Sequence, residues 1–142
     1  MSNPFRPSTT EGDNSGVPES NAETVRRGFE AAARGDVDAV AALLDENVYW
    51  GAPDRESGCQ NRHQALRWMS EGLARGINVN VVEARELDDG RVLLSLQRTI
   101  PHDGEGELPE PHGQIVSLRD GKITEMLVYP TAAEARSAAA PA

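Results

Sequence analysis

The chain has 142 residues, enough for one folded domain with a substantial core. Its formal net charge of −9 argues against binding to nucleic acid or to an anionic membrane, because both attract clustered Lys and Arg. A single cysteine, Cys59, excludes an internal disulfide and a cysteine-based zinc site. The first twenty residues hold no apolar run behind a basic segment, so we expect a cytoplasmic protein.

Both ends of the chain are poor in residues that form a core. Residues 1–19 are rich in Pro, Gly, Ser and Thr, which predicts a disordered N-terminal tail. Residues 137–142 are a low-complexity segment of Ala, Ser and Pro, which predicts a flexible C-terminal tail. We therefore expect one domain over residues 20–136.

Helix signals dominate the first half of this domain. Residues 20–23 form a capping box, and Gly35 ends the helix that follows it. Asp36 then caps a second, shorter helix, and a third helix is predicted from Asn61 to Gly76. Apolar stripes at helical spacing mark the sides that these helices bury, and they consist of Val25, Phe29, Ala32, Ala33, Val37, Val40, Ala41, Leu44, Ala65, Leu66, Met69 and Leu73.

The remaining segments predict strands and a short closing helix. The strands are expected at residues 48–51, 77–87, 91–100, 113–119 and 123–129, and the closing helix at about 130–135. Asp120-Gly121 predicts a type I′ hairpin turn, in which both central residues need a positive φ. Three N-terminal helices before strands joined by hairpins predict an α+β fold, with the helices packed on a curved, mostly antiparallel sheet. Such a sheet would enclose a cone.

The last predicted strand is apolar on both faces. Simple alternation places Met126 and Val128 on one face, and Ile123, Leu127 and Tyr129 on the other. A strand of this kind is covered on both sides. Helices would cover one face, and a second sheet, a partner subunit or a folded-over part of the same sheet would cover the other. We therefore expect a homodimer formed through the sheet.

Several short segments carry a resemblance to a known family. They are Gly35-Asp36, Leu-Asp-Glu-Asn-Val-Tyr-Trp at 44–50, Asn-Arg-His-Gln-Ala at 61–65, Leu-Arg-Asp-Gly-Lys-Ile at 118–123, Tyr129 and Ala-Glu-Ala at 133–135. Their order over residues 21–136 resembles the nuclear transport factor 2-like superfamily, and within it the SnoaL-like branch. The resemblance implies a cone whose open end holds a small, mostly apolar molecule, often in a homodimer. Its members include isomerases, polyketide cyclases, epoxide hydrolases and dehydratases, and also proteins without catalysis, so the site must decide the function.

One activity of that superfamily can be tested on the sequence. The resemblance places the oxyanion-binding tyrosine of ketosteroid isomerase at Gly28, its base at Ala52, its second tyrosine at Met69 and its protonated aspartate near Gln114. None of the four side chains is retained. Because steroid isomerisation needs a base and oxyanion donors, we reject this activity.

The residues expected on the inside of the cone predict an apolar pocket that contains one amide side chain. The expected substrate-binding residues are Phe29, Trp50, Trp68, Met69, Arg98, Gln114, Met126 and Val128. Plain core packing is the alternative for each large apolar residue. A buried Gln114 would need a ligand, a water or a polar neighbour, because an unpaired buried amide costs about 1–3 kcal/mol. The sequence leaves open whether Arg98, or Gln97 and Thr99, faces this pocket.

Two residues are candidates for moving a proton. His112 shares a strand face with Gln114 and titrates near neutral pH, and a bulge after the first strand would swing Asp54 into the cone. His63, His102 and His112 lack the spacing of a metal site, and no glycine-rich phosphate loop follows a strand, so we expect no metal and no cofactor. The acidic segment 101–111 disfavours entry of an anionic substrate past it.

Two functions fit this sequence. The first is a small-molecule-binding SnoaL-like protein that acts as an acid-base enzyme of cyclase, isomerase or hydratase type on an apolar molecule. The second is a non-catalytic homodimeric binding or scaffold module whose cone is filled by its own side chains.

Overall fold

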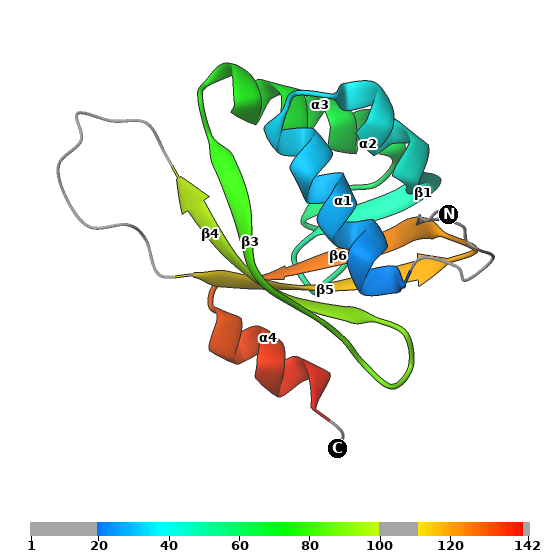
Figure 1. The fold of residues 1–142 in the computed structure, drawn as a ribbon, viewed down its shortest axis with the longest axis vertical. Helices are drawn as coiled ribbons and strands as arrows, with labels where there is room; N and C mark the ends of the chain where they lie inside the picture. The colour runs from blue at the N-terminus through cyan, green and yellow to red at the C-terminus, as the bar shows by residue number, and fades with distance from the viewer. Residues whose placement is uncertain (1–19, 100–110, 141–142) are drawn as a thin grey trace, which may run out of the picture.

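The structure is a computed structural model that describes residues 20–99 and 111–140 (Figure 1). Its elements in chain order are α1 (Asn21–Ala33), α2 (Val37–Leu43), β1 (Leu44–Gly51), β2 (Gly58–Cys59), α3 (Arg62–Ala74), β3 (Asn78–Glu86), β4 (Val92–Thr99), β5 (His112–Arg119), β6 (Lys122–Tyr129) and α4 (Ala132–Ala139). The predicted N-terminal tail and almost all of the acidic segment lie outside the described residues.

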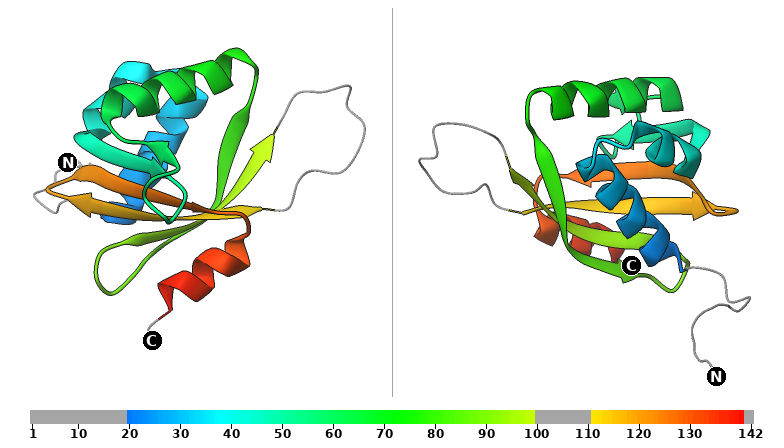
Figure 2. Two further views of the ribbon diagram at one scale, coloured as in Figure 1. Left: turned by 180° about the vertical axis from the view of Figure 1, so that it is seen from behind. Right: turned by 45° about the horizontal axis from the view of Figure 1, so that its top comes forward.

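The described strands form one curved sheet with the order β2-β1-β6-β5-β4-β3. All neighbouring strands run antiparallel except β1 and β6, which are parallel. The helices α1, α2 and α3 lie on one side of the sheet, and α4 lies on the other (Figures 1 and 2). The predicted α+β class is confirmed, and the described residues hold three N-terminal helices and the closing helix α4.

Side-chain caps fix where the three N-terminal helices begin. The Ser20 Oγ accepts from the Glu23 amide at 3.1 Å, and the Glu23 carboxylate accepts from the Ser20 amide at 3.3 Å, which completes the predicted capping box. The Asp36 carboxylate accepts from a first-turn amide of α2 at 3.1 Å, and the Asn61 side chain does the same for α3 at 2.9 Å. Gly35 adopts a φ of +75° between α1 and α2, as the predicted helix stop requires.

The first strand begins earlier than the sequence predicted. Instead of starting at Val48, β1 starts at Leu44, immediately after the end of α2. Its pairing with β6 shifts between Leu44 and Tyr49, so the polar residues 45–47 lie in an irregular part of the strand. Polar composition made this segment resemble a loop, although Leu44 is buried in the core.

The hairpin between β5 and β6 has the predicted turn. Asp120 has a φ of +53° and Gly121 a φ of +78°, the positive values that a type I′ turn needs at both central positions. The turn therefore sets the two strands antiparallel at the place where local sequence predicted it.

A bulge next to this turn changes which residues face the helices. Ser117 pairs with Glu125, but Leu118 pairs with Ile123, so Thr124 is an extra residue on β6. The extra residue places Ile123 on the helix-covered face, where it is buried in the core. The prediction that Ile123 lies on the opposite face is wrong, because simple alternation fails across a bulge.

The sheet has a core on each side. The inner core, between the sheet and α1–α3, has as its largest fully buried residues Val25, Val48, Val92, Leu94, Leu96 and Val116. On the outer side, Leu93 and Ile115 pack with Ala135 of α4, and Tyr129 borders this cluster. Gly113 lets α4 approach closely, because a Cβ atom built there would lie 2.4 Å from the Ala135 Cβ.

The chain's own closing helix thus covers part of the outer face. From the sequence we expected a second sheet, a partner subunit or a folded-over part of the same sheet to cover this face. Because α4 covers part of it instead, less apolar surface is left for a partner subunit. Helix α4 also continues to Ala139, beyond residue 136, where we expected the domain to end.

Candidate functional site

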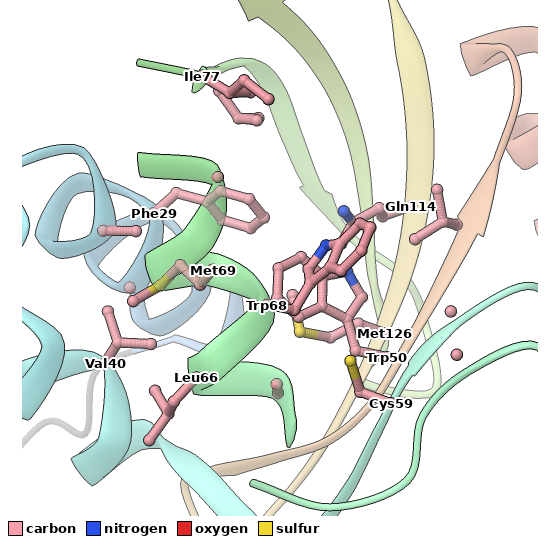
Figure 3. Close-up of a pocket in the computed structure, with 18 of the residues that line it drawn as sticks. Phe29, Val40, Trp50, Cys59, Leu66, Trp68, Met69, Ile77, Gln114 and Met126 are labelled. Carbon is pink, nitrogen blue, oxygen red and sulfur yellow. The ribbon is translucent and has the colours of Figure 1, made fainter. Parts of the chain in front are cut away.

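A cavity of about 880 Å³ lies between the inner face of the sheet and α1–α3 (Figure 3). All eight residues predicted to bind a substrate line it: Phe29, Trp50, Trp68, Met69, Arg98, Gln114, Met126 and Val128. The wall is mainly apolar, and both tryptophans of the chain belong to it. The structure therefore brings these residues to one cavity, while their role in binding stays a prediction.

The tryptophans occupy different parts of the wall. Trp50 lies on β1, where it pairs with Met126 of β6 and with Cys59 of β2. Trp68 lies on α3 and is 59% exposed, which places it at the edge of the cavity. An exposed indole beside a cavity supplies a large flat surface that an apolar molecule can cover.

Sequence reasoning missed part of the wall. Val40 and Leu66 were recognised only as members of helical apolar stripes, although both line the cavity (Figure 3). Cys59, Arg75 and Ile77 also line it, and they lie at element ends, where periodicity gives no information about direction.

Gln114 is the most unusual residue of the wall. It lies on β5, paired with Leu94 of β4 and Val128 of β6, and it is only 3% exposed. Its Oε1 atom is buried and has no hydrogen-bond partner among the described residues. An unpaired buried acceptor costs about 1–3 kcal/mol. Gln114 therefore brings to the cavity wall an amide whose oxygen has no partner among the described residues.

His112 and Arg98 continue the polar side of the wall. His112 precedes Gln114 by two residues on β5, shares its face and pairs with Leu96, two residues before Arg98 on β4. Burial and the nearby Arg98 charge lower the pKa of His112 below its ordinary value of 6.5. The His112 imidazole is therefore neutral at neutral pH and can accept a proton.

The direction of Arg98 was left open by the sequence. Val92, Leu94 and Leu96 are fully buried on the inner face of β4, and alternation puts Arg98 on the same face. Arg98 accordingly lines the cavity, whereas Gln97 and Thr99 do not.

Asp54 lies away from the cavity wall. It is exposed in the loop between β1 and β2, where its carboxylate accepts from the Glu56 amide at 2.7 Å, the Ser57 amide at 2.8 Å and the Ser57 hydroxyl at 2.7 Å. These hydrogen bonds lower the pKa of Asp54. The predicted bulge does not swing its side chain inward, and its contacts are those of a residue that holds a turn.

The loop that contains Asp54 is attached to the sheet at several points. The buried Tyr49 hydroxyl donates to the Ala52 carbonyl at 2.6 Å. Arg55 binds Glu125 of β6 through two hydrogen bonds, of 2.5 and 3.2 Å. Gly51 allows the two strands to approach, since a Cβ atom there would lie 2.5 Å from the Ser57 carbonyl oxygen. These contacts hold Trp50 and Cys59 in the cavity wall.

Other kinds of site find little support in residues 20–99 and 111–140. No group of three or more His, Cys, Asp or Glu side chains gathers there in a way that could hold a metal ion. In the same part of the chain, no helix is long and apolar enough to cross a membrane.

Solved structures share this architecture. Bal32a, from a soil-derived mobile gene cassette, is 27% identical, with a TM-score of 0.63 over 77% of this chain and 87% of its own. The epoxide hydrolase/cyclase-like enzyme SalBIII, described for pyran ring formation in the polyether salinomycin, is 19% identical, with a TM-score of 0.64 over 77% and 88%.

An LEH-like epoxide hydrolase of M. tuberculosis is 18% identical, with a TM-score of 0.61 over 77% of this chain and 80% of its own. The identities of 18 and 19% indicate a shared fold and no more. No protein of curated function matches this sequence significantly.

The family assignment comes from the sequence match. The model of the SnoaL-like domain matches residues 25–126, which include most of α1, all of α2 and α3, and most of the sheet. This segment is well over half of the 142 residues and contains most of the cavity wall. The chain therefore belongs to the SnoaL-like domain family.

Proposed function

We propose that this protein binds an apolar small molecule in the cavity and moves a proton on it. The observation that carries the proposal is the cavity itself, with the unpaired Gln114 amide in its wall. Its volume of about 880 Å³ lies within the range of small-molecule sites, which is roughly 300–1,000 Å³. The same volume counts against the alternative of a cone filled by its own side chains.

His112 is the group best suited to the proton transfer. No Asp or Glu is among the described residues that line the cavity, so a carboxylate base is not available in this wall. Burial raises the pKa of the Cys59 thiol, which keeps it protonated at neutral pH. The neutral His112 imidazole would accept a proton from a C–H or O–H bond, and Arg98 beside it would stabilise the negative charge that develops.

The class of reaction follows from these groups. A proton that His112 removes from one atom can return to another atom of the same molecule, as in an isomerisation, a ring closure or the addition of water. The fold shared with SalBIII and with an epoxide hydrolase supports a reaction of cyclase or hydratase type.

Deuterium exchange tests the proposal without knowledge of the natural substrate. Apolar ketones and β-keto esters are incubated with the protein in D2O, and NMR follows loss of the proton next to the carbonyl group. We expect exchange with the wild type, loss of at least about a hundredfold in His112→Gln, and little change in Asp54→Asn. Exchange that survives His112→Gln but disappears in Asp54→Asn would assign the proton transfer to Asp54 instead.

The homodimer and the cytoplasmic location remain part of the proposal. A dimer through the sheet would use the part of the outer face that α4 leaves free, beyond the cluster of Leu93, Ile115 and Ala135. Sedimentation equilibrium at micromolar concentration tests it. A mass of about 15.3 kDa would refute the dimer, and the binding proposal would be unaffected.

A further inference from the structure

The charged residues of the cavity wall all have the same sign. The chain contains 23 acidic and 14 basic residues, yet among the described residues the charged ones that line the cavity are Arg75 and Arg98. Neither arginine has a carboxylate partner within ion-pair distance in the described part of the chain. Within the described residues, the charge that this acidic protein presents to its cavity is therefore that of two guanidinium groups without a carboxylate partner.

The two arginines lie near the same end of the cavity. Arg75 caps the C-terminal end of α3, and the chain continues from there into β3. Arg98 pairs with Val79 near the start of β3. Both side chains are exposed, so they can reach a group that sits at the opening.

Gln114 lies deeper along the same wall. It pairs with Leu94, four residues before Arg98 on β4, which separates the two positions by ~13 Å along the strand. Between them lies His112, and Trp50, Met126 and Phe29 form apolar parts of the surrounding wall (Figure 3). The wall thus offers a buried acceptor at one end, a mainly apolar middle that includes His112, and positive charge at the other end.

We infer that the ligand is an organic acid with an apolar body, a carboxylate bound by Arg98 and Arg75, and a hydroxyl that donates to the Gln114 Oε1. This assignment rests on the proposed function and adds the chemical class of the molecule. Guanidinium groups suit a carboxylate because their planar donors match its two oxygens. A ligand hydroxyl satisfies the acceptor that the fold leaves unpaired.

The acidity of the rest of the chain does not oppose this assignment. The sequence disfavoured the entry of an anionic substrate, because the segment 101–111 is acidic. Charges separated by more than ~8 Å through solvent are largely screened at physiological ionic strength, whereas groups lining the cavity act at contact. Among the described residues, the charges that act at contact on a molecule in the cavity are therefore those of Arg75 and Arg98.

Three naphthalene probes separate the two polar contacts. They are 6-hydroxy-2-naphthoate, 2-naphthoate without the hydroxyl, and the neutral methyl ester of 6-hydroxy-2-naphthoic acid, each titrated by calorimetry. We expect the hydroxy acid to bind wild type about tenfold more tightly than either other probe. Arg98→Gln should weaken both acids about fivefold and leave the ester within about twofold, since an exposed ion pair contributes modestly.

Two further variants complete the test. Gln114→Leu should reduce the affinity for the hydroxy acid about tenfold, to that of 2-naphthoate, without weakening 2-naphthoate. Arg85→Gln, an exposed arginine of β3 that does not line the cavity, should change none of the affinities. Circular dichroism verifies that each variant is folded.

The outcomes separate this inference from the proposed function. If the ester binds as tightly as the acids and Arg98→Gln changes nothing, the acid class is wrong, and the apolar binding site stands. If Gln114→Leu weakens all three probes equally, the hydroxyl contact is wrong. If no probe binds the wild type, the proposed binding function fails, and this inference fails with it.

Discussion

Replacing Gln114 with leucine should make the fold more stable and the site less selective. In the wild type, the Gln114 Oε1 is buried without a partner, and the residue is 3% exposed. An unsatisfied acceptor of this kind costs about 1–3 kcal/mol, and leucine has a similar size without the polar atoms. Allowing for imperfect packing, we expect the free energy of unfolding to rise by about 1–2 kcal/mol. For a domain of this size, the melting temperature should rise by about 5 °C.

Urea unfolding of the ligand-free protein measures this gain, and Gln114→Glu is the matched control. A carboxylate at this site is buried among apolar groups, so its folded-state pKa lies above its unfolded value of about 4.3. Gln114→Glu should therefore lose stability as the pH rises from 4 towards 8, whereas Gln114→Leu should show no such slope relative to wild type. A loss of more than about 1 kcal/mol in Gln114→Leu would mean that the amide is well paired, and would refute the reasoning about the site.

Two other predictions concern the walls around the cavity. NMR titration should give His112 a pKa below 6.5, and Arg98→Gln should raise it, because a positive neighbour is removed. The folded state favours the neutral form of His112, so the free energy of unfolding should fall as the pH drops from about 6.5 through the folded-state pKa. His112→Gln should remove this loss of stability. A His112 pKa at or above 6.5 would contradict the burial of its imidazole. Gly113→Ala should destabilise the protein by about 1–3 kcal/mol in thermal unfolding, because the new Cβ meets α4. Gly72→Ala, in the last turn of α3 where a new Cβ meets no other atom, should instead add about 0.5–1 kcal/mol of stability. Equal effects of the two glycine substitutions would contradict the packing of α4 on β5.

Local sequence signals predicted much of the fold because each has a nearby physical cause. The cap at Ser20, the cap at Asp36 and the Asp120-Gly121 turn depend on hydrogen bonds or φ values within a few residues. The site was predictable in part for the same reason. Alternation along β5 puts His112 and Gln114 on one face whatever lies opposite.

The features that sequence did not predict depend on contacts between distant segments. The extra residue Thr124 in β6 is visible only in its pairing with β5, and it moved Ile123 to the other face. The direction of Arg98 depended on which side of β4 the helices cover. The position of Asp54 depended on Ser57, whose amide and hydroxyl hold the carboxylate in a turn. Period and propensity carry none of this information.

Native mass spectrometry tests the central claim, that the cavity is a binding site, most directly. Wild type is compared with Val128→Phe, a single substitution that adds an aromatic ring to the cavity wall. Val128 pairs with Gln114 across β5 and β6. Both are measured as purified and after addition of 6-hydroxy-2-naphthoate. We predict a noncovalent one-to-one complex with the wild type that is strongly reduced in Val128→Phe. Equal binding by both proteins, or by neither, would contradict the account.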